Sequence, residues 1–472
     1  MNQSSATAIV ILAAGQGTRM KSRLPKVMHR LAGRPMVRHA QAVGETVKPA
    51  LSVVVIAPGM EDVARAVAPA QTVVQSPALG TGHAVAQARP LLEGFEGTVL
   101  VLYGDTPLIR PETIQRMVAA RQGEGNPAVV VLGFQAADPG AYGRLVLGAD
   151  GGLDRIVEFK EATPEERAIT LCNSGVMAID GRHLFSLLDA VGNANAKGEY
   201  YLTDIVAIAR ERGLKTAVVE GEEQEVLGVN SRLELAGAEA ILQDRLRRHW
   251  MAEGVTMQDP ASVYLSHDTV LGRDVILEPH VWFGPGVAVG EGAVIHAFSH
   301  IEGASVAAGA EVGPYARLRP GAELEAGAKV GNFVEVKNAI LGAGAKVNHL
   351  SYVGDAWVGP KANIGAGTIT CNYDGYNKHL TVIGAGAFIG SNSTLVPPLT
   401  IGAGAFTGAG SVITRSVEDD ALGITRAEQK TVKGAARKLR ERNAAAKAAG
   451  TYPKPDPRAG GRAQSNNPKG GK

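Results

Sequence analysis

Apolar runs alternate with amphipathic stretches over about the first 230 residues of the chain. The runs cover residues 8–14, 51–57, 98–103 and 128–134, and each is long enough for a buried strand. Amphipathic stretches between such runs are typical of helices that cross over a mostly parallel sheet. We therefore predict a doubly wound, Rossmann-like α/β domain over residues 1–231. Helix formers without proline then predict a linker helix over 232–253.

A six-residue period replaces this pattern after the linker helix. Aliphatic or aromatic residues recur at every sixth position from Leu265, with one-residue slips at Val306, Leu341 and Val358, and glycine commonly follows them. Three such hexapeptides make one triangular coil whose aliphatic side chains point inward, which predicts a parallel β-helix domain with a C-terminal extension over residues 254–450. Its left-handed sense is taken from known hexapeptide-repeat proteins, because right-handed crossovers dominate elsewhere.

Composition agrees with a soluble globular protein. Glycine, at 59 of 472 residues, is nearly twice its usual share, and the repeat accounts for the excess. No apolar stretch approaches the roughly 20 residues of a membrane helix or has the flanks of a signal peptide, so we expect a cytoplasmic protein without membrane insertion. Two distant cysteines, Cys172 and Cys371, form no disulfide framework and argue against thiolate metal sites.

The near-neutral net charge of +2 hides a basic C-terminal segment. From Arg426 onward 13 Lys and Arg face 3 Asp and Glu, which gives +10 and leaves −8 for the rest. A solvated tail is the preferred interpretation over nucleic-acid binding, and residues 451–472 are expected to be disordered. A second irregular segment, residues 368–381, breaks the six-residue period and is expected to leave the coil as a loop, where sites are often built.

Three clusters in the first domain carry candidate chemistry. The first strand runs into a glycine-rich loop with Gly15 and Gly17, and Arg19 and Lys26 add positive charge, as a phosphate site requires. Met20 replaces the third glycine of the dinucleotide fingerprint, and no P-loop lysine follows. A structural turn explains the loop equally well when it is taken alone.

The other two clusters of candidate residues lie after apolar runs further along the chain. Gln75 and the segment 80–84 (GTGHA) suit either a pocket for a flat ring or a turn before a helix. Asp105 follows the strand predicted at 98–103, at the sheet edge where ligands of parallel α/β sheets bind, and a carboxylate there can hold Mg²⁺ against nucleotide phosphates. A helix cap is the alternative role for Asp105, and its combination with the first loop favours the metal.

The segments LAAGQGTRM, LPK, GTGHA and YGDTPL together resemble the sugar-nucleotidyltransferase family. With the hexapeptide repeats, the chain from about residue 6 to 430 is similar to a bacterial family of bifunctional enzymes. Its members are both glucosamine-1-phosphate N-acetyltransferases and N-acetylglucosamine-1-phosphate uridylyltransferases. The resemblance implies the two reactions in that order, with acetyl-CoA and UTP as co-substrates.

For uridylyl transfer, the resemblance implies that Arg19 and Lys26 hold the UTP phosphates and that Asp105 and Asn230 bind Mg²⁺. No covalent nucleophile is required, because positioning and charge neutralisation suffice for phosphoryl chemistry. The residues expected to bind UTP or UDP-N-acetylglucosamine are Leu12, Ala13, Ala14, Gly15, Lys26, Gln75, Gly80, Thr81, Tyr103, Gly104, Asp105, Gly143, Glu158, Asn173 and Asn230.

For acetyl transfer, a base must take a proton from the sugar amine, and imidazole suits this task near neutral pH. We assign the base to His349, which without the resemblance would be interpreted as structural or solvated. Glu335 is expected to orient or polarise it, and Ser391 to help stabilise the oxyanion. The resemblance further implies that glucosamine phosphate binds Arg319, Lys337, Tyr352 and Asn363, and that acetyl-CoA binds Ala366, Asn372, Tyr373, Ser391, Ala409 and Arg426.

Three alternatives remain open from the sequence. The β-helix could be purely structural in a nucleotidyltransferase; His296, His300 and His349 could hold zinc between subunits; or the chain could be a scaffold without catalysis. The spacing of the histidines disfavours zinc, and the phosphate loop disfavours a scaffold. By resemblance, we expect a homotrimer that binds no nucleic acid.

Overall fold

The computed structural model describes residues 6–195 and 197–451. Residues up to Ile424 form one compact unit, and a second begins at Thr425. The second unit contains the exposed helix α10 (Ala435–Ala448). Most of the tail expected to be disordered lies outside the described residues. Within the described ranges, no helix is long and apolar enough to cross a bilayer.

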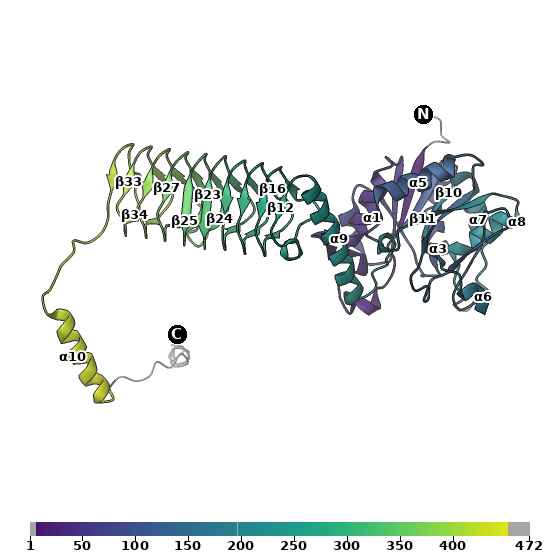
Figure 1. Cartoon of the computed structure of the whole chain (residues 1–472), viewed down its shortest axis with the longest axis horizontal. Helices are drawn as coiled ribbons and strands as arrows, with labels where there is room; N and C mark the ends of the chain where they lie inside the picture. The colour runs from purple at the N-terminus through teal and green to yellow at the C-terminus, as the bar shows by residue number, and fades with distance from the viewer. Residues whose placement is uncertain (1–5, 196, 452–472) are drawn as a thin grey trace, which may run out of the picture. The chain divides into compact units, whose positions relative to one another are not determined.

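The first half of the chain folds around a sheet with the strand order β11-β7-β10-β6-β1-β4-β5 (Figure 1). All neighbours on this path are parallel except β10, which runs antiparallel to β6 and β7. The strands are β1 (Thr7–Leu12), β4 (Leu51–Ile56), β5 (Gln71–Val74), β6 (Thr98–Tyr103), β7 (Val129–Gln135), β10 (Leu171–Asp180) and β11 (Thr216–Gly221), with β8 (Arg144–Leu147) and β9 (Leu153–Val157) attached beside β10 and the hairpin β2 (Arg30–Leu31) and β3 (Arg34–Pro35) apart from it.

Helices and short 3₁₀ turns connect these strands. The helices are α1 (Met36–Glu45), α2 (Glu61–Val67), α3 (Thr81–Ala86), α4 (Arg89–Leu92), α5 (Pro111–Gln122), α6 (Pro164–Arg167), α7 (Gly181–Leu188) and α8 (Ile205–Glu211), and the turns are η2 (Thr18–Met20), η3 (Lys26–Met28), η4 (Leu202–Asp204) and η5 (Glu223–Glu225). Strands β1, β6 and β7 are buried over nearly their whole length, as expected where helices cover both faces of a parallel sheet. The predicted Rossmann-like α/β class is confirmed.

Helix α9 (Arg232–Ala252) occupies the segment between the two repeating patterns. It begins where the Ser231 hydroxyl accepts the Glu234 N–H at 3.3 Å and ends before Gly254, whose φ of 97° only glycine adopts readily. Ala238 packs with Leu31 and Leu108, and Gln243 exchanges hydrogen bonds of 2.7 and 2.9 Å with the backbone of Leu265. The helix therefore contacts both the sheet domain and the first coil after it.

The second half is the parallel β-helix that the six-residue period predicts, with the left hand expected from hexapeptide-repeat proteins (Figure 1). Val270 pairs with Ala288, eighteen residues later, so one coil holds three hexapeptides. At the first slip Val289 pairs with Val306, one residue sooner, and both side chains remain buried. The predicted loop 368–381 is shorter in the structure, because Ile369–Thr370 still pairs within the coil. Ala356 pairs with Thr381, twenty-five residues later, and the residues between Thr370 and Thr381 leave the coil as a loop.

The β-helix strands are mostly two or three residues long. They are β12 (Thr256–Met257), β13 (Val270–Leu271), β14 (Ile276–Leu277), β15 (Trp282–Phe283), β16 (Ala288–Val289), β17 (Val294–Ile295), β18 (His300–Ile301), β19 (Ala304–Val306), β20 (Glu311–Val312), β21 (Arg317–Leu318), β22 (Ala322–Leu324), β23 (Lys329–Asn332), β24 (Glu335–Leu341), β25 (Lys346–His349), β26 (Tyr352–Val358), β27 (Asn363–Ile364), β28 (Ile369–Thr370), β29 (Thr381–Ile383), β30 (Phe388–Ile389), β31 (Thr394–Leu395), β32 (Leu399–Ile401), β33 (Phe406–Thr407), β34 (Val412–Ile413) and β35 (Leu422–Gly423), preceded by η6 (Pro260–Ser262). Each coil buries its aliphatic residues in one continuous core.

Candidate functional site

A cavity of about 420 Å³ opens at the carboxyl ends of β1 and β6. Residues from distant segments meet there, as expected at this edge of an α/β sheet. The predicted nucleotide-site residues that line it are Leu12, Ala13, Ala14, Gly15, Lys26, Gln75, Gly80, Thr81, Tyr103, Asp105, Glu158 and Asn173.

The glycine-rich loop reaches this cavity because it folds back on Lys26. Gly17 has a φ of 61°, and a Cβ there would lie 2.5 Å from the Lys26 Cβ. Gly104 donates its N–H to the Leu12 carbonyl at 3.0 Å, which joins the ends of β1 and β6. Arg19, on η2, is exposed and is not among the lining residues.

Two oxygen atoms converge on one cation beside the cavity. The Lys26 ammonium forms an ion pair with the Asp105 carboxylate and donates to Asn230 Oδ1 at 3.0 Å. Val229 N–H donates to the Asp105 carbonyl at 2.9 Å, so the segments that carry the two predicted ligands lie side by side. One carboxylate and one amide oxygen aimed at a single cation fit a divalent metal that completes its shell with phosphate oxygens and water.

The expected sugar-binding residues are neighbours. Asn173 N–H donates to the Gly143 carbonyl at 2.8 Å, and a Cβ on Gly143 would meet the Glu158 carboxylate at 3.6 Å. Burial raises the pKa of Glu158, and it likewise raises the pKa of Tyr103, where the charge of Asp105 adds to it.

The expected base-binding residues are held by local hydrogen bonds. Gln75 Nε2 donates to the Gly80 carbonyl at 2.9 Å, and the Thr81 hydroxyl accepts Leu202 N–H at 3.0 Å. Gly80 has a φ of 106°, and a Cβ there would lie 2.6 Å from the Tyr200 carbonyl oxygen. The pocket wall therefore depends on glycine at this position.

Sequence reasoning missed the segment 197–203, which lies beside Gly80 and Thr81. The further lining residues are Gln16, Val27, Ala78, Ala84, Lys197, Glu199, Tyr201 and Thr203. The sequence around 197–203, KGEYYLT, carries two aromatic and several polar residues just before α8, which is the signal that could have found it.

Two groups of predicted acetyl-transfer residues lie on the β-helix. In the first, the predicted Glu335 and Tyr352 stand opposite one another on β24 and β26, and Arg317, which was not predicted, stands opposite Glu335 on β21. Arg319 Nη1 donates to Glu335 Oε1 at 2.7 Å, and Lys337 follows Glu335 on the same strand. Asn363 lies on another face, opposite Lys346.

His349 contacts a different residue from the one expected. Its Nδ1 lies 2.6 Å from Asn332 Oδ1, on the neighbouring coil, beside a hollow of about 250 Å³. Among the described contacts of this single chain, Glu335 pairs with Arg319 and Arg317, and no contact joins it to His349. An amide oxygen only accepts, so Nδ1 is the donor in this contact, and in the neutral ring Nε2 then presents a lone pair.

The second group forms a column at one corner of the coil. The backbone of Asn392 donates to the Ala366 carbonyl at 2.7 Å, and that of Gly410 donates to the Ser391 carbonyl at 2.8 Å. Ala366, Ser391 and Ala409 therefore stand on successive coils. Arg426 belongs to the second unit.

The loop between β28 and β29 has its own hydrogen-bond network. The Asp374 carboxylate accepts the N–H of Asn377 and Tyr376 at 2.6 and 2.8 Å and contacts His379 at 2.7 Å, and these bonds hold its pKa well below the usual range. Asn372 reaches into the coil to Asp355. Contact with the ammonium of Lys378 lowers the pKa of Lys337, so two cations meet where a phosphate is expected. Lys378 is a further residue that motif reasoning did not single out.

The histidines of the zinc alternative have other partners in this chain. His296 Nδ1 lies 2.9 Å from Glu278 Oε1, and His300 stacks on Trp282 with ring centroids 4.1 Å apart. Over residues 6–195 and 197–451, no cluster of three or more His, Cys, Asp and Glu side chains could hold a metal ion.

Comparison with known proteins covers both halves. A MobA-like NTP transferase domain matches residues 9–169, and the bacterial transferase hexapeptide repeat matches residues 380–415. The chain is 60% identical to "Bifunctional protein GlmU" of Paramagnetospirillum magneticum, over 94% of this chain and 99% of the relative. The protein of the same name from Rhodospirillum rubrum is 64% identical, over 92% and 97%. That of Rhizorhabdus wittichii is 62% identical, over 92% and 96%.

Proposed function

Because this chain belongs to the GlmU family of bifunctional enzymes, we propose that its two candidate sites carry out the two successive transfers. It is an N-acetyltransferase and a uridylyltransferase. The β-helix acetylates glucosamine-1-phosphate with acetyl-CoA, and the sheet domain then transfers UMP from UTP to give UDP-N-acetylglucosamine and pyrophosphate. The observation that carries the proposal is the cavity at the ends of β1 and β6, where twelve of the expected nucleotide-site residues meet.

In uridylyl transfer, a phosphate oxygen of N-acetylglucosamine-1-phosphate attacks the α-phosphorus of UTP and pyrophosphate leaves. Gln75, Gly80 and Thr81 bind the base, Glu158 and Asn173 bind the sugar, and Lys26 and Arg19 neutralise the phosphates. A divalent cation, which we propose is Mg²⁺, would be held by Asp105 and Asn230 and would supply further charge neutralisation.

In acetyl transfer, Arg319 and Lys337 hold the sugar phosphate, joined by Lys378 from the loop. The amine attacks the thioester carbonyl and His349 Nε2 accepts the amine proton; the C–S bond then breaks and CoA leaves as the thiol, taking that proton. Asn332 holds the ring in the tautomer that leaves this nitrogen free to accept. Ser391, in the corner column, and Asn372 and Tyr373, in the loop, are proposed to bind acetyl-CoA.

We further propose the division of the chain at the ends of α9, with uridylyl transfer over residues 1–231 and acetyl transfer over 254–450. A homotrimer would let neighbouring chains complete the acetyl-transfer site, and the group formed by Arg319 and Lys337 and the corner column would then meet across subunits. The reactions are assigned to the cytoplasm, where both co-substrates are used.

A split assay on one preparation tests the proposal. Thiol release from acetyl-CoA with glucosamine-1-phosphate reports the first reaction, and pyrophosphate release from UTP with N-acetylglucosamine-1-phosphate reports the second. We expect His349→Ala to abolish only thiol release and Asp105→Ala to abolish only pyrophosphate release. If the wild-type protein releases pyrophosphate but no thiol, the β-helix is structural and the assignments on it are wrong.

A further inference from the structure

The two proposed metal ligands come from segments that are far apart in the sequence. Asp105 follows β6, whereas Asn230 lies between η5 and α9. The backbone bond from Val229 to Asp105 joins the segments, and the buried Val229 side chain shares an apolar cluster with Leu108. Both contacts lie next to the ligands, and the direction in which the chain reaches Asn230 also depends on an attachment earlier in the segment.

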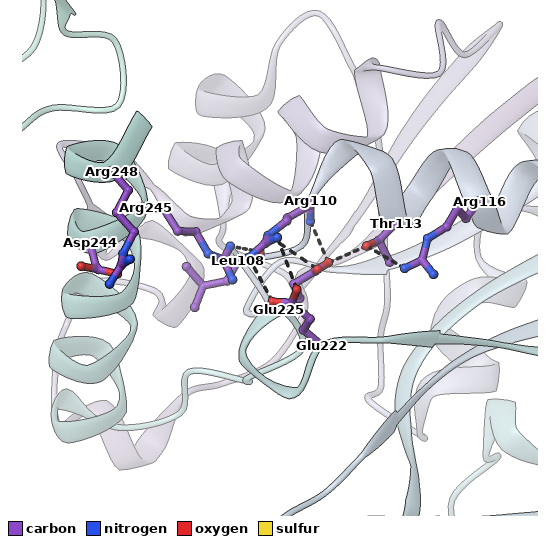
Figure 2. Close-up of polar contacts among 9 residues, drawn as sticks. All are labelled: Leu108, Arg110, Thr113, Arg116, Glu222, Glu225, Asp244, Arg245 and Arg248. Atoms are coloured by element: carbon purple, nitrogen blue, oxygen red, sulfur yellow. Dashed lines mark hydrogen bonds and ion pairs between the residues drawn. The ribbon is translucent and has the colours of Figure 1, made fainter. Parts of the chain in front are cut away.

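Glu225 provides such an attachment (Figure 2). Its side chain is only 3% exposed, although it carries a charge. Glu225 Oε2 accepts the Thr113 hydroxyl at 2.7 Å and the Arg110 backbone N–H at 3.2 Å, and Oε1 lies 3.6 Å from Arg110 Nε. A buried carboxylate needs such partners, since an unpaired one is costly.

These partners lie at the start of α5. Arg110 is the residue before the first turn, and Thr113 is in that turn. The carboxylate therefore satisfies an N–H group that the helix leaves open and lies near the positive end of its dipole. Through α5 the segment 222–230 is tied to the chain just after Asp105. From α9, Arg245 Nη1 donates to the Leu108 carbonyl at 2.5 Å and holds the same stretch on another side.

Glu222 provides a contrast within the same network. It also binds Arg110, at 3.0 Å, but its side chain is 62% exposed (Figure 2). Exposed ion pairs of this kind contribute little to a fixed geometry. The two glutamates thus share a partner and differ in burial and in their contact with the helix.

We propose that Glu225 is a positioning residue for the divalent metal site. It holds the segment 225–230 against the segment 105–113, so that the oxygens of Asp105 and Asn230 face one cation. The proposal rests on the proposed function, in which these two residues bind the metal. A helix cap without this role would change stability and leave metal affinity unaltered.

Mn²⁺ binding to the full-length protein, measured from the free-ion electron paramagnetic resonance signal, tests the proposal. For Glu225→Leu, which removes both acceptors, we expect a dissociation constant at least about tenfold higher. The apparent KM for Mg²⁺ in pyrophosphate release should rise by a similar factor, while kcat at saturating Mg²⁺ stays within about twofold. Glu225→Gln keeps one acceptor oxygen and should stay within about threefold of the wild type.

The control is Glu222→Leu, which should bind Mn²⁺ within about twofold of the wild type. A folded Glu225→Leu protein that binds Mn²⁺ as the wild type does overturns the proposal. If Glu225→Leu does not fold, Thr113→Val tests the proposal instead, because it removes the hydroxyl that donates to Glu225 and keeps the shape of the side chain. About threefold weaker Mn²⁺ binding supports the proposal and unchanged binding overturns it.

A ligand variant separates this inference from the proposed function. Asp105→Asn should weaken Mn²⁺ binding strongly, because it removes a charged ligand. If it binds Mn²⁺ like the wild type, the proposed metal site itself is wrong. If Asp105→Asn weakens Mn²⁺ binding and Glu225→Leu does not, the proposed metal site is supported and the positioning role of Glu225 is wrong.

Discussion

The ammonium of Lys26 lies 3.0 Å from Asn230 Oδ1 and also pairs with Asp105. A cation therefore stands between the two oxygens proposed to hold the metal, and a metal ion must displace it. Two positive charges at one position repel strongly, so metal and lysine exclude one another there. Phosphates that draw Lys26 toward the cavity would release the oxygens, which couples metal binding to nucleotide binding.

Replacing Lys26 by Met removes the competing cation. Lys26→Met should bind Mn²⁺ roughly fivefold more tightly than the wild type in the absence of nucleotide, and its KM for UTP should rise about tenfold or more. Paramagnetic resonance titration and initial-rate assays measure the two effects. Weaker Mn²⁺ binding by the variant contradicts the competition.

We predict that no other residue can replace Gly80, because an added Cβ would contact the Tyr200 backbone and because the φ of Gly80 is positive. In Gly80→Ala the new Cβ would lie 2.6 Å from the Tyr200 carbonyl and push the wall of the cavity outward. We expect the KM for UTP to rise about tenfold. Gly59→Ala is the matched control, since Gly59 also has a positive φ, 79°, but nothing lies within 4 Å of the added atom. Equal effects of both changes on KM would show that contact with Tyr200 is unimportant.

Asn332 should matter for acetyl transfer through His349. Asn332→Leu removes the acceptor 2.6 Å from Nδ1 and frees the ring to rotate and to change tautomer. Thiol release should fall about tenfold in kcat, with pyrophosphate release unchanged. Asn332→Asp retains an acceptor and should recover most of the rate; an Asn332→Leu rate equal to that of the wild type would refute the role.

Lys378 is expected to act with Lys337 on the sugar phosphate. The pKa of Lys337 is lowered by its neighbour, and an anion between the two ammonium groups relieves that repulsion. Lys378→Ala should raise the KM for glucosamine-1-phosphate about fivefold or more without a similar change for acetyl-CoA. Lys361→Ala, at an exposed corner, is the control. Steady-state kinetics with each substrate varied in turn measure the two KM values.

Asp180 makes the sheet domain sensitive to acid. Burial alone would raise its pKa, but hydrogen bonds from Arg182 and the charge of Arg121 outweigh burial and lower the pKa. Because the folded pKa is the lower one, this stabilisation is present above about pH 4 and is lost as the pH falls through the lowered value.

Asp180→Asn should therefore lower the free energy of unfolding by about 3 kcal/mol at pH 7, because Arg121 stays buried without its partner. The difference from the wild type should shrink as the pH falls through the lowered pKa of Asp180. Urea unfolding at several pH values measures it. Asp189→Asn, which breaks the exposed pair with Arg89, should change stability by less than about 1 kcal/mol. A difference that persists in acid contradicts the pKa assignment.

Patterns that depend on burial were predictable from the sequence. Strands β1 and β6 are continuous apolar runs because helices cover both faces, and the pairing of Val289 with Val306 keeps the six-residue rule through a slip. The contact of His349 with Asn332 was missed, although the two residues are register partners on the adjacent strands β23 and β25. The role of Glu225 was not predictable, because its burial appears only when η5 packs against α5.

Each regular coil of the β-helix takes up eighteen residues and adds one strand spacing along its axis. Adding or deleting one whole coil between the first turn of the β-helix and His349 would leave the stacking on both sides intact. Such a change would shift the acetyl-transfer residues along the axis by one strand spacing, about 4.8 Å, without altering their neighbours. The distance along the axis between the two proposed sites can therefore change only in steps of one coil, because a coil with one residue fewer, as at Val306, or with extra residues, as before Thr381, keeps the same stacking.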